Sequence, residues 1–144
     1  MFDAVLVAHD GSDNAWRALR AAAELARRSE GRVVVGHVRE WTFPPMVAPP
    51  VGFEEIELET DEGVRELEEI ALKRLAEEGV PATFEVRRAP RGQVAPALLR
   101  MAEDAGADTI VMGTRGLGDL KALLLGSVAH DVLRLGRTPV LVVR

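Results

Sequence analysis

A glycine-rich segment with one arginine is the part of this sequence whose residue types and spacing could do chemistry. Gly113 and Gly116 come at the end of an apolar run, and Gly126-Ser127 opens a helical pattern a short distance further on. The backbone N–H groups of such a loop can approach an anion closely, and the dipole of the following helix favours negative charge at its start. Arg115 adds a positive charge within the loop. The segment therefore predicts a phosphate-binding site.

Two well-known phosphate motifs do not fit this segment. The loop has the glycine spacing of a Walker A motif, but Asp119-Leu120 stands where that motif requires Lys followed by Ser or Thr. It also begins like a dinucleotide-binding fingerprint, yet Lys121 occupies the third glycine position and the loop does not follow the first strand. Both motifs are excluded.

Five apolar runs alternate with four amphipathic stretches, and these elements must position the loop. The runs lack polar alternation, as do strands of a parallel sheet that is covered on both faces. The alternation predicts one doubly wound α/β domain over residues 1–144, with a five-stranded parallel sheet, helices on both faces and right-handed crossovers. The expected strands are Ala4–Ala8, Val33–Val38, Thr83–Val86, Thr109–Met112 and Val140–Val143. The expected helices run from about Asp13 to Arg28, Asp61 to Glu78, Gln93 to Ala105 and Gly126 to Leu135.

A glycine follows each expected helix and precedes the next expected strand. These residues are Gly31, Gly79, Gly106 and Gly136. Glycine supplies the left-handed backbone conformation that commonly ends a helix. We expect the four glycines to end the helices in this way.

The connection from Trp41 to Thr60 is long and carries an unusual composition. Four prolines in its first ten residues preclude a helix there, and a loop of this length is typical of a lid or of a disordered segment. Nine acids and one base between Glu54 and Glu69 give this stretch a charge of −8, so the rest of the chain, whose total is −5, carries +3. The total argues against nucleic acid as a partner. A small anionic ligand held by the rest of the chain is not excluded.

The composition excludes several further classes of protein. A chain of 144 residues that is 47% hydrophobic and 28% charged is typical of one soluble globular domain. Because there is no cysteine, disulfides, thiolate nucleophiles and cysteine-based metal sites are excluded, and the three histidines show no metal-ligand spacing. The sequence lacks a signal-peptide pattern and an apolar stretch near the ~20 residues of a spanning helix. We expect a cytoplasmic protein with no membrane partner.

The glycine-rich segment matches a longer pattern. Gly113-Thr114-Arg115-Gly116, nine residues, and then Gly126-Ser127 follow the spacing G-x(2)-G-x(9)-G-[ST]. In this respect the sequence resembles the nucleotide-binding branch of the universal stress protein family. The resemblance covers the whole chain and includes the stretches Val7–Ser12, Gly36–Val38, Ala107–Gly113 and Thr138–Val143.

The resemblance implies the strand order 3-2-1-4-5 among the five expected strands and a switch point between the first and the fourth. It implies ATP bound there, with or without a Mg²⁺ or Mn²⁺ ion bridging the phosphates. Ala8, His9 and Asp10 would line the adenosine end, and Val38 would contact adenine through its backbone. The residues around ribose and phosphates would be Met112, Gly113, Arg115 and Gly116, followed at the helix start by Gly126, Ser127 and Val128. His9 stands where the family more often has a small or hydroxyl residue.

The resemblance also implies a homodimer, since family members commonly pair through their last strand. In this sequence that strand, Val140 to Val143, is an apolar edge without the charges that usually protect one.

Three functions are compatible with the sequence. The first is an ATP-binding regulatory or nucleotide-sensing dimer, with at most slow hydrolysis because no obvious general base or nucleophile lies beside the phosphates. The second is a slow ATPase or adenylyl-transferring enzyme, in which Asp10 would be metal ligand or base. The third is an interaction module without nucleotide, in which Asp10 and Ser127 would serve only as helix-start residues.

Overall fold

A parallel sheet forms the centre of the molecule. The structure is a computed structural model that describes residues 1–43, 55–115 and 125–144. Five strands lie parallel in the order β4-β2-β1-β5-β6: β1 (Ala4–Ala8), β2 (Arg32–Thr42), β4 (Ala82–Pro90), β5 (Thr109–Gly113) and β6 (Val140–Val143). A two-residue strand, β3 (Ile56–Glu57), pairs antiparallel with the end of β2. The predicted α/β fold and strand order are confirmed, and β3 adds a sixth, antiparallel strand.

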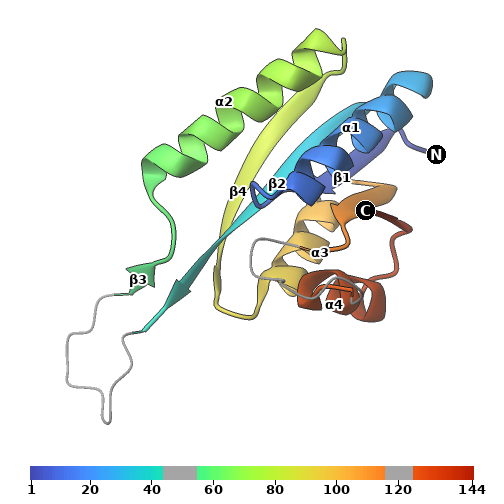
Figure 1. The fold of residues 1–144 in the computed structure, drawn as a ribbon. Coiled ribbons are helices and arrows are strands. Elements are labelled where there is room, and N and C mark those ends of the chain that lie inside the picture. Colours follow the sequence, from blue (N-terminus) through green and yellow to red (C-terminus); the bar gives the residue numbers. More distant parts are fainter. Residues whose placement is uncertain (44–54, 116–124) are drawn as a thin grey trace.

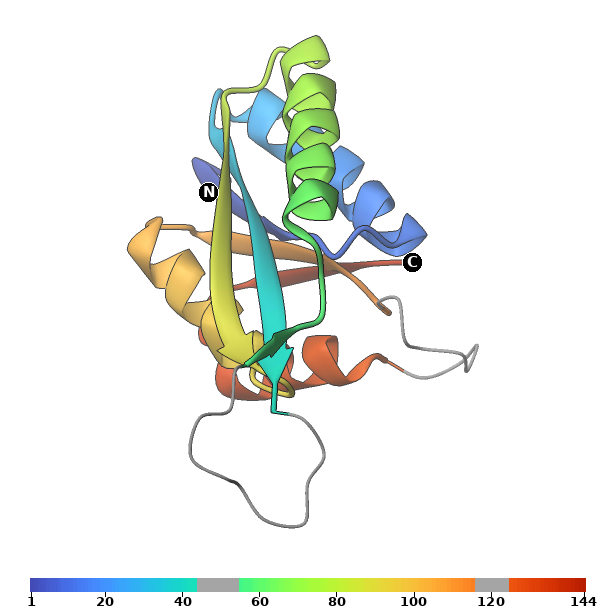
Figure 2. The same ribbon diagram turned by 90° about the vertical axis from the view of Figure 1, so that its left-hand side faces the viewer.

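Helices cover both faces of this sheet (Figures 1 and 2). Within the described ranges, α1 (Asp13–Arg28) and α2 (Asp61–Glu77) lie on one face, and α3 (Val94–Asp104) and α4 (Ser127–Leu135) lie on the other. Neighbouring side chains of a strand point to opposite faces, so Val35 packs in the core under α1 and α2 while Val34 packs under α3 and α4. Both positions are fully buried, which explains the continuous apolar runs. No helix in the described ranges is both long and apolar enough to cross a bilayer.

The helices on the first face begin at side-chain caps. The Ser12 hydroxyl accepts a hydrogen bond from the Ala15 N–H at 3.2 Å, and the Thr60 hydroxyl accepts one from the Gly63 N–H at 3.1 Å. Each cap satisfies a backbone donor that has no partner within the helix. Local chemistry therefore sets where α1 and α2 start, which agrees with the predicted boundaries.

The prediction that four glycines end helices in the left-handed conformation is half wrong. Gly79 and Gly106 have φ of +70° and +62°, as expected, but after α1 the left-handed residue is Glu30, with φ of +53°. Gly31 is required for space instead, because a Cβ there would lie 2.2 Å from the carbonyl oxygen of Phe2. A Cβ on Gly136 would likewise lie 2.7 Å from Leu99 Cδ2. Close packing between segments explains these two glycines.

Strands β2 and β4 are longer than the apolar runs that predicted them. They pair in parallel from Val33 with Ala82 to Trp41 with Pro90, and β3 continues the pairing on the other side of Trp41. Beyond Val38 the strand is no longer buried on both faces, so its sequence loses the apolar signature. The extension carries β2 past the carboxyl ends of β1 and β5 and forms one side of the site. Most of the connection that we expected to be a lid or a disordered segment, residues 44–54, lies outside the described residues.

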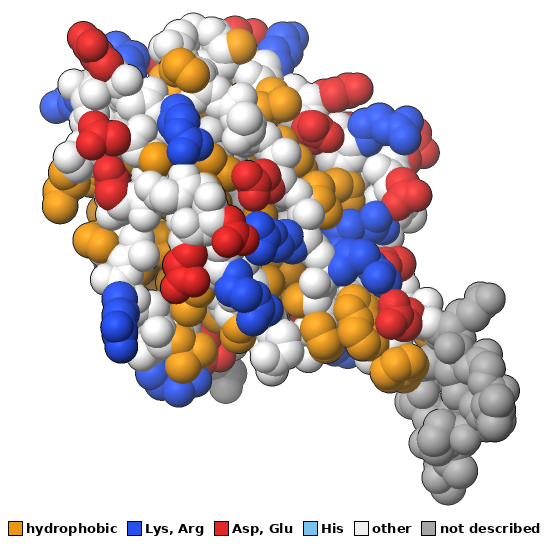
Figure 3. Space-filling model, turned by 180° about the vertical axis from the view of Figure 1, so that it is seen from behind, with side chains coloured by type: hydrophobic (Ala, Val, Ile, Leu, Met, Phe, Trp, Pro, Cys, Tyr) orange, Lys and Arg blue, Asp and Glu red, His pale blue; other side chains and the backbone are white. Residues whose placement is uncertain are grey.

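The acidic stretch before α2 forms ion pairs with arginines of the sheet, so its acids do more than keep this surface solvated. Arg88 of β4 pairs with Glu55 at 2.6 Å and with Glu57 at 2.5 Å, and Arg39 of β2 pairs with Asp61 at 2.6 Å. Acidic and basic side chains are interspersed over the face shown in Figure 3. These ion pairs hold β3 and the start of α2 against the extended strands.

Candidate functional site

A pocket lies at the carboxyl ends of the central strands. Its volume is about 440 Å³. Its lining comes from the ends of β1, β2 and β5, the segments that follow β1, β4 and β5, Glu59 before α2, and parts of α1, α3 and α4. The strand order reverses at β1, which lies between β2 and β5, and this is where doubly wound sheets bind ligands. The volume falls within the range of roughly 300–1,000 Å³ that is usual for small-molecule sites.

The residues that the sequence predicts for a nucleotide come together around this pocket. Ten of the eleven line it: Ala8, His9, Asp10, Val38, Met112, Gly113, Arg115, Gly126, Ser127 and Val128. Gly116, the eleventh, lies outside the described residues. Three segments far apart in the chain therefore meet at one cavity.

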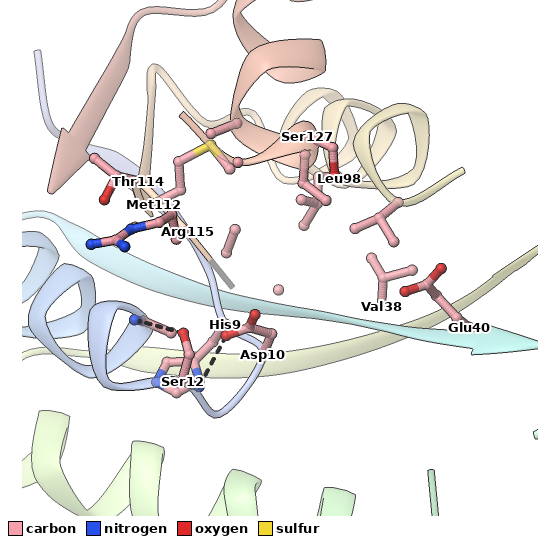
Figure 4. Close-up of a pocket in the computed structure, with 18 of the residues that line it drawn as sticks. His9, Asp10, Ser12, Val38, Glu40, Leu98, Met112, Thr114, Arg115 and Ser127 are labelled. Carbon is pink, nitrogen blue, oxygen red and sulfur yellow. Dashed lines mark hydrogen bonds between the residues drawn. The ribbon is translucent and has the colours of Figure 1, made fainter. Parts of the chain in front are cut away.

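Three charged residues of the lining were missed at the sequence level: Glu40, Glu59 and Arg91. Glu40 belongs to the extension of β2 and Arg91 directly follows the extension of β4, so both were hidden by strand ends placed too early. Figure 4 shows Glu40 and Val38 at one side of the pocket and Arg115 at the opposite side. The Arg91 N–H donates to the Trp41 carbonyl at 2.9 Å, which places Arg91 beside the extension of β2. The side near Val38 therefore carries charges of both signs, and Arg115 lies at the opposite side.

The β1–α1 loop is held in one conformation by its own side chains. Gly11 has φ of +85°, the Asp10 carboxylate accepts a hydrogen bond from the Ser12 N–H at 3.0 Å, and Ser12 caps α1. Asp10 therefore shapes the turn while it also lines the pocket.

The glycine-rich segment is closed at its base. The Gly126 N–H donates to the Thr114 carbonyl at 2.6 Å, and the Thr114 N–H donates to the Val143 carbonyl at 2.8 Å. Gly126 precedes α4 in an extended conformation and provides no side-chain cap. Among the described residues, no side chain caps α4, which leaves its first-turn N–H groups to an acceptor in the pocket.

The His9 side chain braces the loop against the first helical layer. Only 3% of the residue is exposed, its ring lies 4.1 Å from the Trp16 ring in an edge-on arrangement, and its Nδ1 accepts from the Gly11 N–H at 3.1 Å. The Arg74 guanidinium stacks on the same tryptophan at 4.2 Å. Because Nδ1 accepts, the proton of the neutral ring resides on Nε2, which has no hydrogen-bond partner among the described residues.

We expect this neutral histidine to make the stability depend on pH. Burial lowers the pKa of His9 to about 4, opposed by Asp10 and reinforced by His37 and Arg74. The unfolded chain, with a pKa near ~6.5, takes up the proton first as the pH falls. The ionisation of His9 therefore leaves the free energy of unfolding unchanged above pH ~6.5. As the pH falls toward ~4, it lowers the free energy of unfolding progressively, by up to about 3 kcal/mol. Urea unfolding of the wild type and of His9→Thr at pH 7 and pH 4.5 measures it, and identical pH dependence in both proteins would contradict it.

The match to the family extends over the whole chain. The model of the universal stress protein family covers residues 1–144. The chain belongs to this family. A relative, universal stress protein YxiE of Bacillus subtilis, is 40% identical over 152 aligned residues that span 100% of both chains.

Two solved structures of the family have the same fold as this universal stress protein chain. The universal stress protein from Archaeoglobus fulgidus in complex with dAMP is 28% identical, with a TM-score of 0.67 and coverage of 97% of this chain and 96% of that one. A universal stress protein in complex with cAMP is 27% identical, with a TM-score of 0.68 and coverage of 99% and 96%.

Proposed function

We propose that the pocket binds an adenine nucleotide, with ATP as the ligand. The observation that carries the proposal is the meeting of the β1–α1 loop, Val38 and the uncapped start of α4 around one cavity at the switch point. The adenosine part would lie along Ala8, Asp10 and Val38. Two relatives with the same fold hold cAMP and dAMP, which supports an adenine nucleotide as the class of ligand.

The charge distribution in the pocket favours one direction for such a ligand. Phosphates would be bound at the start of α4 and beside Arg115, where N–H groups, helix dipole and guanidinium all favour an anion. The side near Val38 combines Glu40 and Glu59 with Arg91, so we expect it to favour an anion less than the start of α4 does. If a Mg²⁺ or Mn²⁺ ion accompanies the phosphates, Asp10 is a carboxylate of the pocket lining that could serve as one of its ligands.

Replacing Ser127 with aspartate tests the phosphate end. Ser127 is the first residue of α4 and lines the pocket. An acid in the first turn stabilises a helix, so we expect Ser127→Asp to fold and to weaken ATP binding at least about tenfold through repulsion of the phosphates. Adenosine, which carries no phosphate, is expected to lose less than about twofold by the same argument. Isothermal titration calorimetry with ATP and adenosine gives both values.

Ser127→Asn is the matched control, because it is polar, close in size to aspartate and uncharged. It is expected to bind ATP far better than Ser127→Asp does. Equal losses for ATP and adenosine in Ser127→Asp, or an unchanged affinity for ATP, would rule out this placement of the phosphates.

We further propose that the chain acts as a cytoplasmic regulatory or nucleotide-sensing homodimer with little or no hydrolysis. β6 pairs with β5 on one side, and its other side has no strand partner among the described residues. Leu141 on that strand is 40% exposed, and an apolar unpaired edge favours pairing with a second copy. Steady-state ATP turnover that is abolished by Asp10→Ala would instead favour an enzyme.

A further inference from the structure

A buried histidine holds the carboxylate of Glu59. The His37 side chain is 3% exposed, its Nδ1 lies 2.7 Å from the His9 carbonyl oxygen, and its Nε2 lies 2.6 Å from Glu59 Oε2. A carbonyl oxygen can only accept, so Nδ1 carries a proton and donates it. Nε2 and Oε2 are within hydrogen-bond distance of each other. One oxygen of Glu59 is therefore engaged by His37.

The backbone around Glu59 is also fixed. Its carbonyl accepts a hydrogen bond from Arg39 Nη2 at 2.9 Å, and the next residue, Thr60, caps α2. The Glu59 side chain is 35% exposed and lines the pocket together with Val38. Within the part of the chain that the structure describes, its second oxygen, Oε1, makes no hydrogen bond. Glu59 also borders a neighbouring groove, so it brings to the edge of the main pocket a carboxylate whose second oxygen has no hydrogen-bond partner among the described residues.

Such an oxygen distinguishes between bases. The 6-position of adenine is an amino group that donates, whereas the 6-position of guanine and hypoxanthine is an oxo group that only accepts. A carboxylate oxygen accepts a hydrogen bond from the 6-amino group, and it is repelled by a 6-oxo group. The neighbouring acid, Glu40, also has one oxygen engaged, by the Gly92 N–H at 3.0 Å. Glu59 differs in that its partner is a buried side chain, His37, which fixes the position of its carboxylate.

We infer that Glu59, positioned by His37, selects a 6-amino purine over a 6-oxo purine in this pocket. The inference rests on the proposed function, since it assumes that the base lies on the side near Val38 and Glu59. His37 acts through Glu59 as a positioning residue.

The test is the ratio of the affinities for adenosine and inosine, which differ at the 6-position. We expect wild type to prefer adenosine at least about tenfold, as one hydrogen bond to a charged group allows. In Glu59→Gln the amide can donate to the 6-oxo group, so the ratio is expected to fall toward one. Glu66→Gln is the matched control: it removes the same charge from α2, in the neighbouring groove that Glu59 also borders but outside the main pocket, and is expected to keep the wild-type ratio.

The positioning role of His37 has its own variant. His37→Gln is expected to lower the adenosine-to-inosine ratio, whereas a merely structural loss would weaken both nucleosides equally. His37 is buried, so His37→Gln could fail to fold. Glu59→Gln, at a partly exposed position, still decides whether Glu59 selects the base.

The possible failures are distinguishable. A wild-type protein that binds neither ATP nor adenosine would overturn the proposed function itself. A wild type that binds both, with an adenosine-to-inosine ratio that is unchanged in Glu59→Gln, would overturn only the selection by Glu59.

Discussion

Gly113→Val is expected to weaken ATP binding by about 100-fold or more. Gly113 ends β5 and lines the pocket. A Cβ at this position would lie 2.7 Å from Asn14 Cβ and 3.1 Å from the Asn14 carbonyl carbon. Both atoms belong to the first turn of α1, so the end of β5 must move and take Thr114 and Arg115 with it. A displacement of about 1 Å is enough to cost roughly two orders of magnitude where binding groups converge on one ligand. Calorimetric titration with ATP measures the loss.

Gly79→Val separates this effect from a general loss of stability. Gly79 follows α2 and lies outside the pocket lining, and a Cβ at this position would meet no atom within 4 Å. Its φ of +70° makes valine strained, at a cost of about 1–2 kcal/mol. We expect Gly79→Val to be less stable and to bind ATP as wild type does. A folded Gly113→Val protein with wild-type affinity for ATP would show that the glycine-rich loop is not the phosphate site.

Gly31→Ala is expected to lower the free energy of unfolding by about 2–3 kcal/mol. The added Cβ would lie 2.2 Å from the Phe2 carbonyl oxygen and 2.8 Å from that of Asp3. Both are backbone atoms, and Asp3 also accepts the Arg32 N–H at 3.0 Å, so neither side can yield without disturbing the start of β1 or β2. Urea unfolding followed by circular dichroism gives the change.

The neighbouring residue provides the control. Glu30 has φ of +53°, so Glu30→Gly removes the strain of a left-handed side chain while it raises the entropy of the unfolded chain. These opposing effects are each about 1 kcal/mol, and we expect little net change. If Gly31→Ala were no more harmful than Glu30→Gly, the first strand would be free to shift, and the steric account of Gly31 would be wrong.

Much of the pocket could be predicted because its residues directly follow buried strands. Ala8 and Asp10 around the end of β1, and Met112 and Arg115 around the end of β5, come at positions where a local apolar pattern stops. The carboxyl ends of parallel strands meet at one edge, so the order of elements alone places these residues together. No contact had to be known in advance.

The acids near Val38 could not be found in this way. Glu40 lies in a part of β2 that is stabilised by pairing with β4 and β3, and not by burial on both faces. Glu59 reaches the pocket from a segment whose position depends on ion pairs such as Arg39 with Asp61. Its sequence context, a run of acids, is typical of a solvated surface.

The sequence by itself determined the alternation of strands and helices, the spacing of the glycine-rich segment and the loops at the carboxyl ends of β1 and β5 that line the pocket. These follow from periodicity and spacing, which act over a few residues. The tertiary structure alone decided that Gly31 is required for space and that His37 meets Glu59, 22 positions away. The physical reason is that both depend on distances between separate segments, and those distances are set by strand register and packing once the whole chain has folded.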